Sequence, residues 1–249
     1  MAKVLLTLRY DGTRFHGWQV QPNGITVQET MQDAIERITG TRSALTGCSR
    51  TDAGVHALRF YCTTDAPARL SPSQFCKALG AVLPSDISVL DAVPVADDFH
   101  PRYSACGKRY VYHIHNGQMR DPFWERYAWH VRTPLDECRL NETAALFLGT
   151  HDFSAFCSAG SSVQDKIRTV RRSEVSRAGD HLTYTVEADG FLYNMVRIFV
   201  GTLMDEHNGK RTKDDIRRAL ACGERKAAGA TAPPQGLFLE EVWYETTKE

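Results

Sequence analysis

The residues best suited to chemistry lie in one short turn, Arg50-Thr51-Asp52-Ala53-Gly54. Asp52 offers a carboxylate, which can act as a nucleophile or as a base. Gly54 tolerates positive φ, so the chain can reverse direction there while the carboxylate projects from the turn. We expect Arg50, two residues earlier, to favour the ionised form of Asp52. The same residues also make an ordinary surface turn with a solvated arginine, and their types alone leave both interpretations open.

A second group alternates basic and aromatic side chains: Lys108, Arg109, Tyr110 and Tyr112 follow one another on a β-prone segment. Cations can pair with phosphates, and aromatic rings can stack on bases. Tyr110, Tyr112 and Ile114 share one face of such a strand. An ordinary strand with its tyrosines in the core fits the same pattern.

The third candidate is Arg197, the only charged residue between Asp189 and Asp205. A guanidinium on so apolar a helix cannot easily reach water, so we expect it to pair with a buried anion. The alternatives are that it extends to the surface or caps backbone carbonyls.

Other clusters carry weaker signals. The loop 13–22 mixes aromatic, basic and amide side chains, which suits nucleotide contacts, but Phe15 and Trp18 can equally pack on the core. The segment 166–172 holds four cations, which fit either phosphate contacts or a solvated strand face. The histidines lack a recognised zinc spacing, and no glycine-rich nucleotide-binding motif is present, so we expect no metal and no cofactor.

The elements that would position these groups alternate between strands and helices. Thr26 and Ser71 are predicted helix N-caps, followed by helices that end near Gly40 and Pro84. The first half is predicted to run β-α-β-β-α-β, the ferredoxin-like order, and the second half to repeat it. The predicted class is therefore α+β, with a first domain over residues 1–98 and a second over 99–249. The expected elements of the second half are strands at 108–115, 127–131, 166–176, 182–188 and 237–244 and helices at 135–148, 191–207 and 212–221.

The composition is that of an ordinary globular protein, with 42% hydrophobic and 24% charged residues and a formal net charge of zero. Zero net charge argues against a protein that coats nucleic acid indiscriminately, although it permits a local basic face. The seven cysteines include no Cys-x-x-Cys pair, which is typical of reduced thiols in the cytoplasm. No segment is apolar and long enough to suggest a membrane span.

Several motifs resemble those of the tRNA pseudouridine synthase A family. The most specific is the block from Arg50 to Ala57, and the segments 99–114 and 190–201 resemble the second and third motifs of the family. The resemblance spans nearly the whole chain. It includes the segments 10–13, 17–19, 149–156 and 233–239.

This resemblance implies a role for each candidate residue. It implies that Asp52 is the nucleophile, that Tyr110 stacks on the target uracil, and that Arg197 pairs with Asp52. Arg50, Lys108 and Arg109 are expected to contact the substrate.

The resemblance also implies the pseudouridine synthase fold, two ferredoxin-like halves whose antiparallel sheets join. The expected reaction is isomerisation of uridine to pseudouridine at positions 38, 39 and 40 of the tRNA anticodon stem-loop. The expected enzyme is a cytoplasmic homodimer that needs no cofactor. Whether Asp52 attacks the base or the ribose stays open, and so does the alternative of a catalytically silent RNA-binding module.

Overall fold

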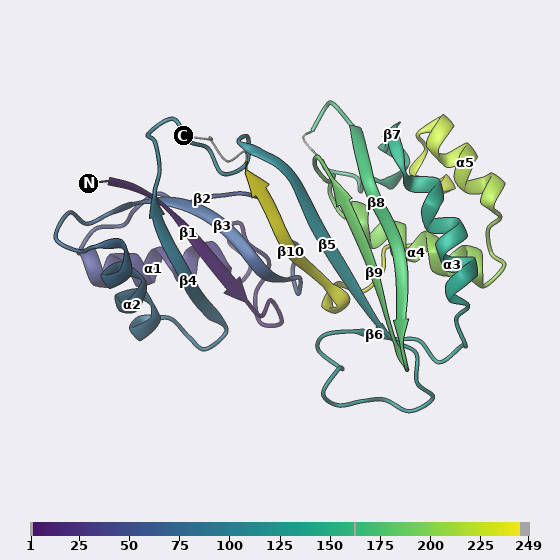
Figure 1. Cartoon of the computed structure of the whole chain (residues 1–249), viewed down its shortest axis with the longest axis horizontal. Coiled ribbons are helices and arrows are strands. Elements are labelled where there is room, and N and C mark those ends of the chain that lie inside the picture. The colour runs from purple at the N-terminus through teal and green to yellow at the C-terminus, as the bar shows by residue number, and fades with distance from the viewer. Residues whose placement is uncertain (1, 162, 245–249) are drawn as a thin grey trace. The chain divides into compact units, whose positions relative to one another are not determined.

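The computed structural model describes residues 2–161 and 163–244, and Figure 1 shows its helices and strands. The chain forms two compact units. Unit 1 comprises residues 1–106 and 238–249, and unit 2 comprises residues 107–237. Both units combine helices with mostly antiparallel strands, so the predicted α+β class is confirmed.

Unit 1 follows the predicted β-α-β-β-α-β order. Its sheet has the strand order β4-β1-β3-β10, and β2 pairs with β3. Figure 1 shows its two helices side by side. Its elements are β1 (Ala2–Tyr10), α1 (Val27–Thr39), β2 (Thr46–Gly47), β3 (His56–Ala66), α2 (Pro72–Val82), β4 (Ile87–Pro94) and β10 (Leu237–Tyr244).

The predicted helix caps of unit 1 are confirmed. The Thr26 side chain accepts a hydrogen bond from the Glu29 amide, and Gly40 ends α1 with φ 76°. Ser71 and Gln74 form a reciprocal capping box at the start of α2, with Pro72 at the first helical position. These local signals place both helices correctly because a cap satisfies amide or carbonyl groups that the helix leaves unpaired.

The last strand of the chain, β10, belongs mainly to unit 1. It pairs in parallel with β3, with Phe238 opposite His56 and Leu239 opposite Ala57. Unit 1 therefore combines the N-terminal half of the sequence with its C-terminal strand, which sequence order alone did not indicate.

Unit 2 has an antiparallel sheet in the order β5-β9-β8-β7, and the short strand β6 pairs with β5. The helix α3 packs against β8 and α4. The regular elements are β5 (Ala105–His115), β6 (Trp129–His130), α3 (Glu137–Ala144), β7 (Gly149–Asp152), β8 (Ile167–Ala178), β9 (His181–Ala188), α4 (Met195–His207) and α5 (Lys213–Cys222). Short 3-10 turns lie at Ala145–Phe147, Ser154–Phe156, Arg225–Ala227 and Pro234–Gly236.

Two helices of unit 2 have other bounds than predicted. The helix predicted over 135–148 is α-helical only to Ala144 and continues as a 3-10 turn to Phe147. The apolar pattern predicted a helix over 191–207, but α4 begins at Met195. Asn194 adopts the left-handed conformation with φ 61°, which a continuing right-handed helix excludes. Residues 191–194 therefore form a loop that leads into α4.

Candidate functional site

Asp52 lies in a tight turn between β2 and β3. The Val55 amide donates to the Asp52 carbonyl oxygen at 3.1 Å, and Gly54 has φ 77°. The predicted role of Gly54 is thus confirmed, because the left-handed conformation is one that glycine adopts without strain. Asp52 is half-buried, whereas Arg50 is exposed.

The loop that follows β1 holds this turn from the other side. The Trp18 amide donates to the Thr51 carbonyl oxygen at 3.1 Å, and the Gly54 amide donates to the Phe15 carbonyl oxygen at 3.2 Å. The Tyr10 and Thr51 hydroxyls are hydrogen-bonded at 2.8 Å in a buried position. The backbone is therefore fixed on both sides of Asp52.

Two glycines permit this close approach. A Cβ atom on Gly17, which has φ 83°, would lie 2.3 Å from the Thr51 carbonyl oxygen. A Cβ on Gly12 would lie 2.0 Å from the Val55 carbonyl oxygen. Phe15 and Trp18 are 4% and 2% exposed, so these rings pack on the core, the alternative that the sequence left open. The loop positions the Asp52 turn through its backbone.

His56 is a supporting residue that the sequence did not single out. Its Nδ1 accepts a hydrogen bond from the Gly12 amide at 3.0 Å, and its ring stacks on Phe238 with centroids 4.5 Å apart. Buried at 1% exposure, it links the loop after β1 to the first residues of β3 and β10. No spacing in the sequence marks it, because its partners, which are the Asp11 carboxylate, the Gly12 amide and the Phe238 ring, lie far from it along the chain.

Tyr110 and Tyr112 point to the same side of β5 and are both buried in unit 2. Tyr110 is 5% exposed, and its ring meets Phe191 edge to face with centroids 5.0 Å apart. The Tyr112 hydroxyl donates to the Pro233 carbonyl oxygen at 2.8 Å. The core position that the pattern allowed is confirmed for both, while stacking of Tyr110 on a base stays a prediction.

Basic residues on the sheet near Tyr110 are paired with carboxylates on the same sheet. Arg109 Nε and Arg172 Nη1 both donate to Glu187 Oε1, at 2.7 and 3.3 Å. Arg172 also donates to Glu174, and this hydrogen bond holds the pKa of the Glu174 carboxyl below its usual value. Lys108 is only 7% exposed. The count of cations in the sequence therefore overstates the positive charge that this face of the sheet presents.

Arg197 projects from the first turn of α4. Its Nε donates to the Ala232 carbonyl oxygen at 2.8 Å, and its Nη1 donates to Asn194 Oδ1 at 2.9 Å. The predicted alternative of carbonyl capping is thus confirmed for one nitrogen. Its ion pair with Asp52 stays a prediction.

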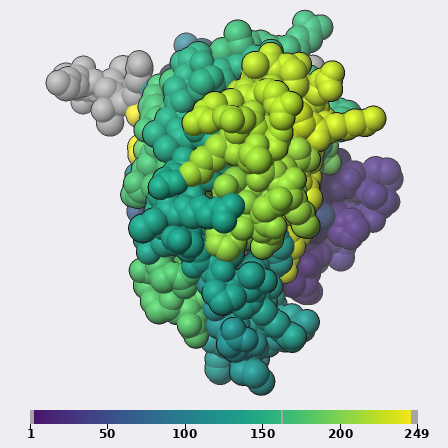
Figure 2. Space-filling model, turned by 90° about the vertical axis from the view of Figure 1, so that its right-hand side faces the viewer, coloured from purple at the N-terminus to yellow at the C-terminus, as the bar shows by residue number. Residues whose placement is uncertain are grey.

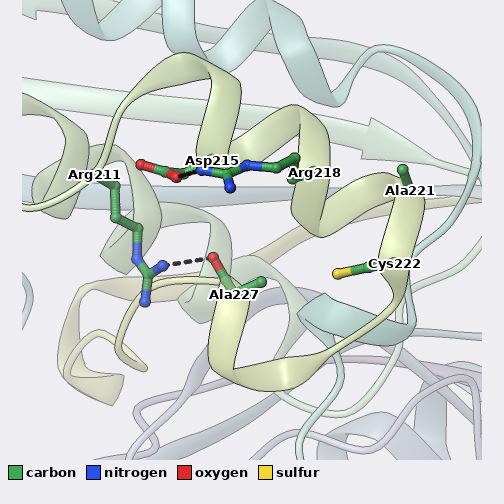
Figure 3. Close-up of a pocket in the computed structure, with 6 residues that line it drawn as sticks. All are labelled: Arg211, Asp215, Arg218, Ala221, Cys222 and Ala227. Atoms are coloured by element: carbon green, nitrogen blue, oxygen red, sulfur yellow. Dashed lines mark hydrogen bonds and ion pairs between the residues drawn. The ribbon is translucent and has the colours of Figure 1, made fainter.

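A pocket of about 450 Å³ in unit 2 contains none of the predicted site residues. Figure 3 shows its lining on α5, on the segment before it and on the turn after it, with Arg211 donating to the Ala227 carbonyl oxygen at 2.6 Å. The Asp215 carboxylate accepts from the Thr212 amide and hydroxyl, both at 2.8 Å, in the N-terminal cap of α5. In Figure 2 the same segment lies on the near surface, in yellow-green. Its polar groups are used within the fold, so we do not assign this pocket as the site.

The part of the chain that the structure describes contains neither a cluster suited to a metal ion nor a helix suited to a membrane span. Within 2–161 and 163–244, His, Cys, Asp and Glu side chains nowhere gather in threes with a geometry that could hold a metal ion. Over the same ranges, every helix is too short or too polar to span a bilayer.

Comparisons with known proteins agree with the motifs. Residues 7–104 and 143–245 match the family described as tRNA pseudouridine synthase. The tRNA pseudouridine synthase A of Thermoanaerobacter sp. (strain X514) is 46% identical over 248 residues, which cover 98% of this chain and 100% of the relative. That of Myxococcus xanthus is 43% identical over 245 residues, covering 98% of this chain and 92% of the relative.

Among solved structures, a crystal structure of a Cbf5-Nop10-Gar1 complex matches with a TM-score of 0.39 and 12% identity. That match covers 97% of this chain and 58% of the other. The family match extends over most of the sequence and includes the Asp52 turn and Arg197, whereas Tyr110 lies between the two matched ranges. The chain belongs to the tRNA pseudouridine synthase family.

Proposed function

We propose that this protein isomerises uridine to pseudouridine at positions 38, 39 and 40 of the tRNA anticodon stem-loop, with Asp52 as the nucleophile. The observation that carries the proposal is the fixed turn of Asp52. Its neighbours Thr51 and Gly54 are hydrogen-bonded to the loop after β1, so the carboxylate starts from one defined backbone position. A preorganised nucleophile loses less entropy when it attacks.

The reaction is an internal rearrangement. The bond from ribose C1′ to uracil N1 breaks, the base rotates, and a bond from C1′ to C5 forms while the C5 proton leaves and N1 gains one. Asp52 attacks the base or the ribose and is released at the end. Atoms and electrons balance without a second substrate. The target uridine must leave the base stack before its glycosidic bond can be reached.

The remaining residues have supporting roles in this proposal. Tyr110 stacks on the extruded uracil and assists removal of the C5 proton. Arg197 pairs with the Asp52 carboxylate and keeps it ionised. Arg50, Lys108 and Arg109 contact the RNA. Arg50 is the most accessible of these three residues, because its side chain is exposed. We further propose a cytoplasmic homodimer with tRNA crossing both subunits, on the family resemblance.

Two alternative functions would have different outcomes for the target uridine. An RNA-binding module without catalysis would leave uridine unchanged, and it would not need a carboxylate that repels phosphate. A hydrolase with Asp52 as nucleophile would release free uracil. Incubation with C5-tritiated tRNA separates all three, because only the isomerase releases tritium to water and leaves the base attached.

The direct test of Asp52 is Asp52→Asn, which keeps the size and removes the charge. We expect tritium release to be abolished while tRNA binding stays near wild type or becomes tighter, since an anion near phosphate is lost. Asp65→Asn, at an exposed position on β3, is the matched control and should keep full activity. Tritium release by Asp52→Asn within tenfold of wild type would assign the attack to another residue.

A further inference from the structure

Asn194 has an unusual backbone. Among the residues that the structure describes, it is the one non-glycine residue with a positive φ, at 61°. Left-handed backbone is costly for residues with a Cβ, although asparagine tolerates it better than most. Such strain persists where the surrounding structure demands it, and it often marks a functional site.

The side chain of Asn194 is not used as a helix cap. Asn194 occupies the N-cap position of α4, where asparagine normally accepts a hydrogen bond from the backbone of the first turn. Its side chain makes no such bond here. Both of its polar atoms have other partners, so helix capping does not explain the residue.

Those partners orient the amide toward Arg197. Asn194 Nδ2 donates to Ser158 Oγ at 2.9 Å, which leaves Oδ1 to accept from Arg197 Nη1 at 2.9 Å. The Ser158 amide in turn donates to the Tyr193 carbonyl oxygen at 3.0 Å, so the serine is tied to the same loop. The amide therefore has one orientation, with its oxygen toward the guanidinium.

The guanidinium is also held from a second direction. Arg197 Nε donates to the Ala232 carbonyl oxygen at 2.8 Å, and the Ala232 amide donates back to the Arg197 carbonyl oxygen at 3.0 Å. The segment around Ala232 is itself anchored to α4, because the Gly229 amide donates to Thr202 Oγ1 at 2.9 Å. Anchors on two separate segments define the plane of the guanidinium.

We propose that Asn194 is a positioning residue for Arg197: its left-handed backbone directs the carboxamide so that the guanidinium has a single orientation toward the reacting groups. This inference rests on the catalytic role proposed for Arg197. A positioning role of Asn194 explains why the chain interrupts an apolar helical pattern at this point. A helical Asn194 would extend α4 and would turn its side chain to a different direction.

The test separates backbone from side chain. Asn194→Gly adopts φ 61° without strain and loses only the two hydrogen bonds of the amide, so Tm should fall slightly and the protein should stay folded. The single-turnover rate should drop about 10- to 100-fold, as expected for a misplaced catalytic group, while KM for tRNA stays unchanged. Asn208→Gly, at the other end of α4, is the matched control and should keep the wild-type rate.

A second comparison shows whether Asn194 acts through Arg197. Adding Asn194→Gly to Arg197→Lys should cause little further loss of rate, because the group being positioned is already altered. The inference about Asn194 would be overturned if Asn194→Gly kept the wild-type rate, or if the two losses of rate multiplied in the double variant. Neither result would affect the role proposed for Arg197. If Arg197→Lys keeps the wild-type rate while Asp52→Asn is inactive, the proposed role of Arg197 fails, and this inference fails with it.

Discussion

Two tyrosines on one strand face show how similar residues can serve different purposes. Tyr112 uses its hydroxyl within the fold, as a donor to the Pro233 carbonyl oxygen, and burial raises its pKa well above the ordinary value. Tyr110 packs its ring edge to face with Phe191, in the loop that leads to Arg197. The residue that Tyr110 contacts therefore lies only a few positions before Arg197 in the chain.

The pair provides a matched prediction at the residue scale. Tyr110→Phe keeps the aromatic face, so tRNA affinity should be retained, while turnover should collapse because the hydroxyl that assists proton removal is gone. Tyr112→Phe should cost roughly 0.5–1.5 kcal/mol of unfolding free energy for its lost hydrogen bond and keep turnover. Tritium release, tRNA binding and urea unfolding of both variants give the measurements. Unchanged turnover in Tyr110→Phe would remove the proton role, and unchanged turnover in Tyr110→Ala would remove the residue from the site.

The need of a single residue for partners was predictable where its side chain is costly to leave unpaired. A lone arginine in an apolar helix needs partners, and Arg197 has them. Which partners it has depends on Ala232, 35 residues away, and on a strained asparagine, neither of which any local pattern reveals. His56 was missed for the same reason, because its importance lies in a contact with the Gly12 backbone.

At the scale of elements, the loop after β1 and the Asp52 turn behave as one structure. The approach of the two backbones depends on Gly17, where a side chain would collide with the Thr51 carbonyl oxygen. Local sequence signals identified the turn and the helix caps because both are satisfied within a few residues. They did not identify the loop as a support, because its partner lies more than thirty residues further along the chain.

Gly17→Ala tests this support. The change should lower turnover strongly, because the Asp52 turn must shift to admit the methyl group, and it should also destabilise unit 1. Gly40→Ala is the matched control: Gly40 has φ 76°, but a Cβ there would meet nothing within 4 Å. It should cost about 1 kcal/mol through backbone strain alone and keep full turnover. Equal turnover in the two variants would show that the loop does not position Asp52.

At the scale of the whole molecule, charge is balanced both overall and locally. The net charge is zero, and Arg109 and Arg172 share Glu187 on the sheet of unit 2. Binding to tRNA should therefore depend on a few cations that are available to phosphate.

The number of phosphate contacts can be measured from the salt dependence of tRNA affinity. Each phosphate contact should contribute a slope of roughly 0.7 to 0.9 log units of affinity per log unit of salt. Arg50→Gln should reduce the slope by about one contact, because Arg50 is exposed. Arg172→Gln, an equal change of charge at a residue paired with two carboxylates, should alter it little. A flat salt response of the wild-type protein would contradict binding through phosphates.

The proposed pair of Asp52 and Arg197 would join residues of different compact units, so it predicts a coupling at the largest scale. Removing one partner of a buried pair typically costs about 3–5 kcal/mol, because the other charge is left uncompensated. Arg197→Met also loses the bonds to Ala232 and Asn194, so its effect alone cannot identify the pair. Those losses are common to both backgrounds of a double-mutant cycle and cancel. We expect Arg197→Met to cost much less in Asp52→Asn than in the wild-type protein, with unfolding free energies taken from amide hydrogen exchange in α1 and α4. Additive costs would mean that the residues are not in contact, and Arg50 would then be the first alternative partner for Asp52.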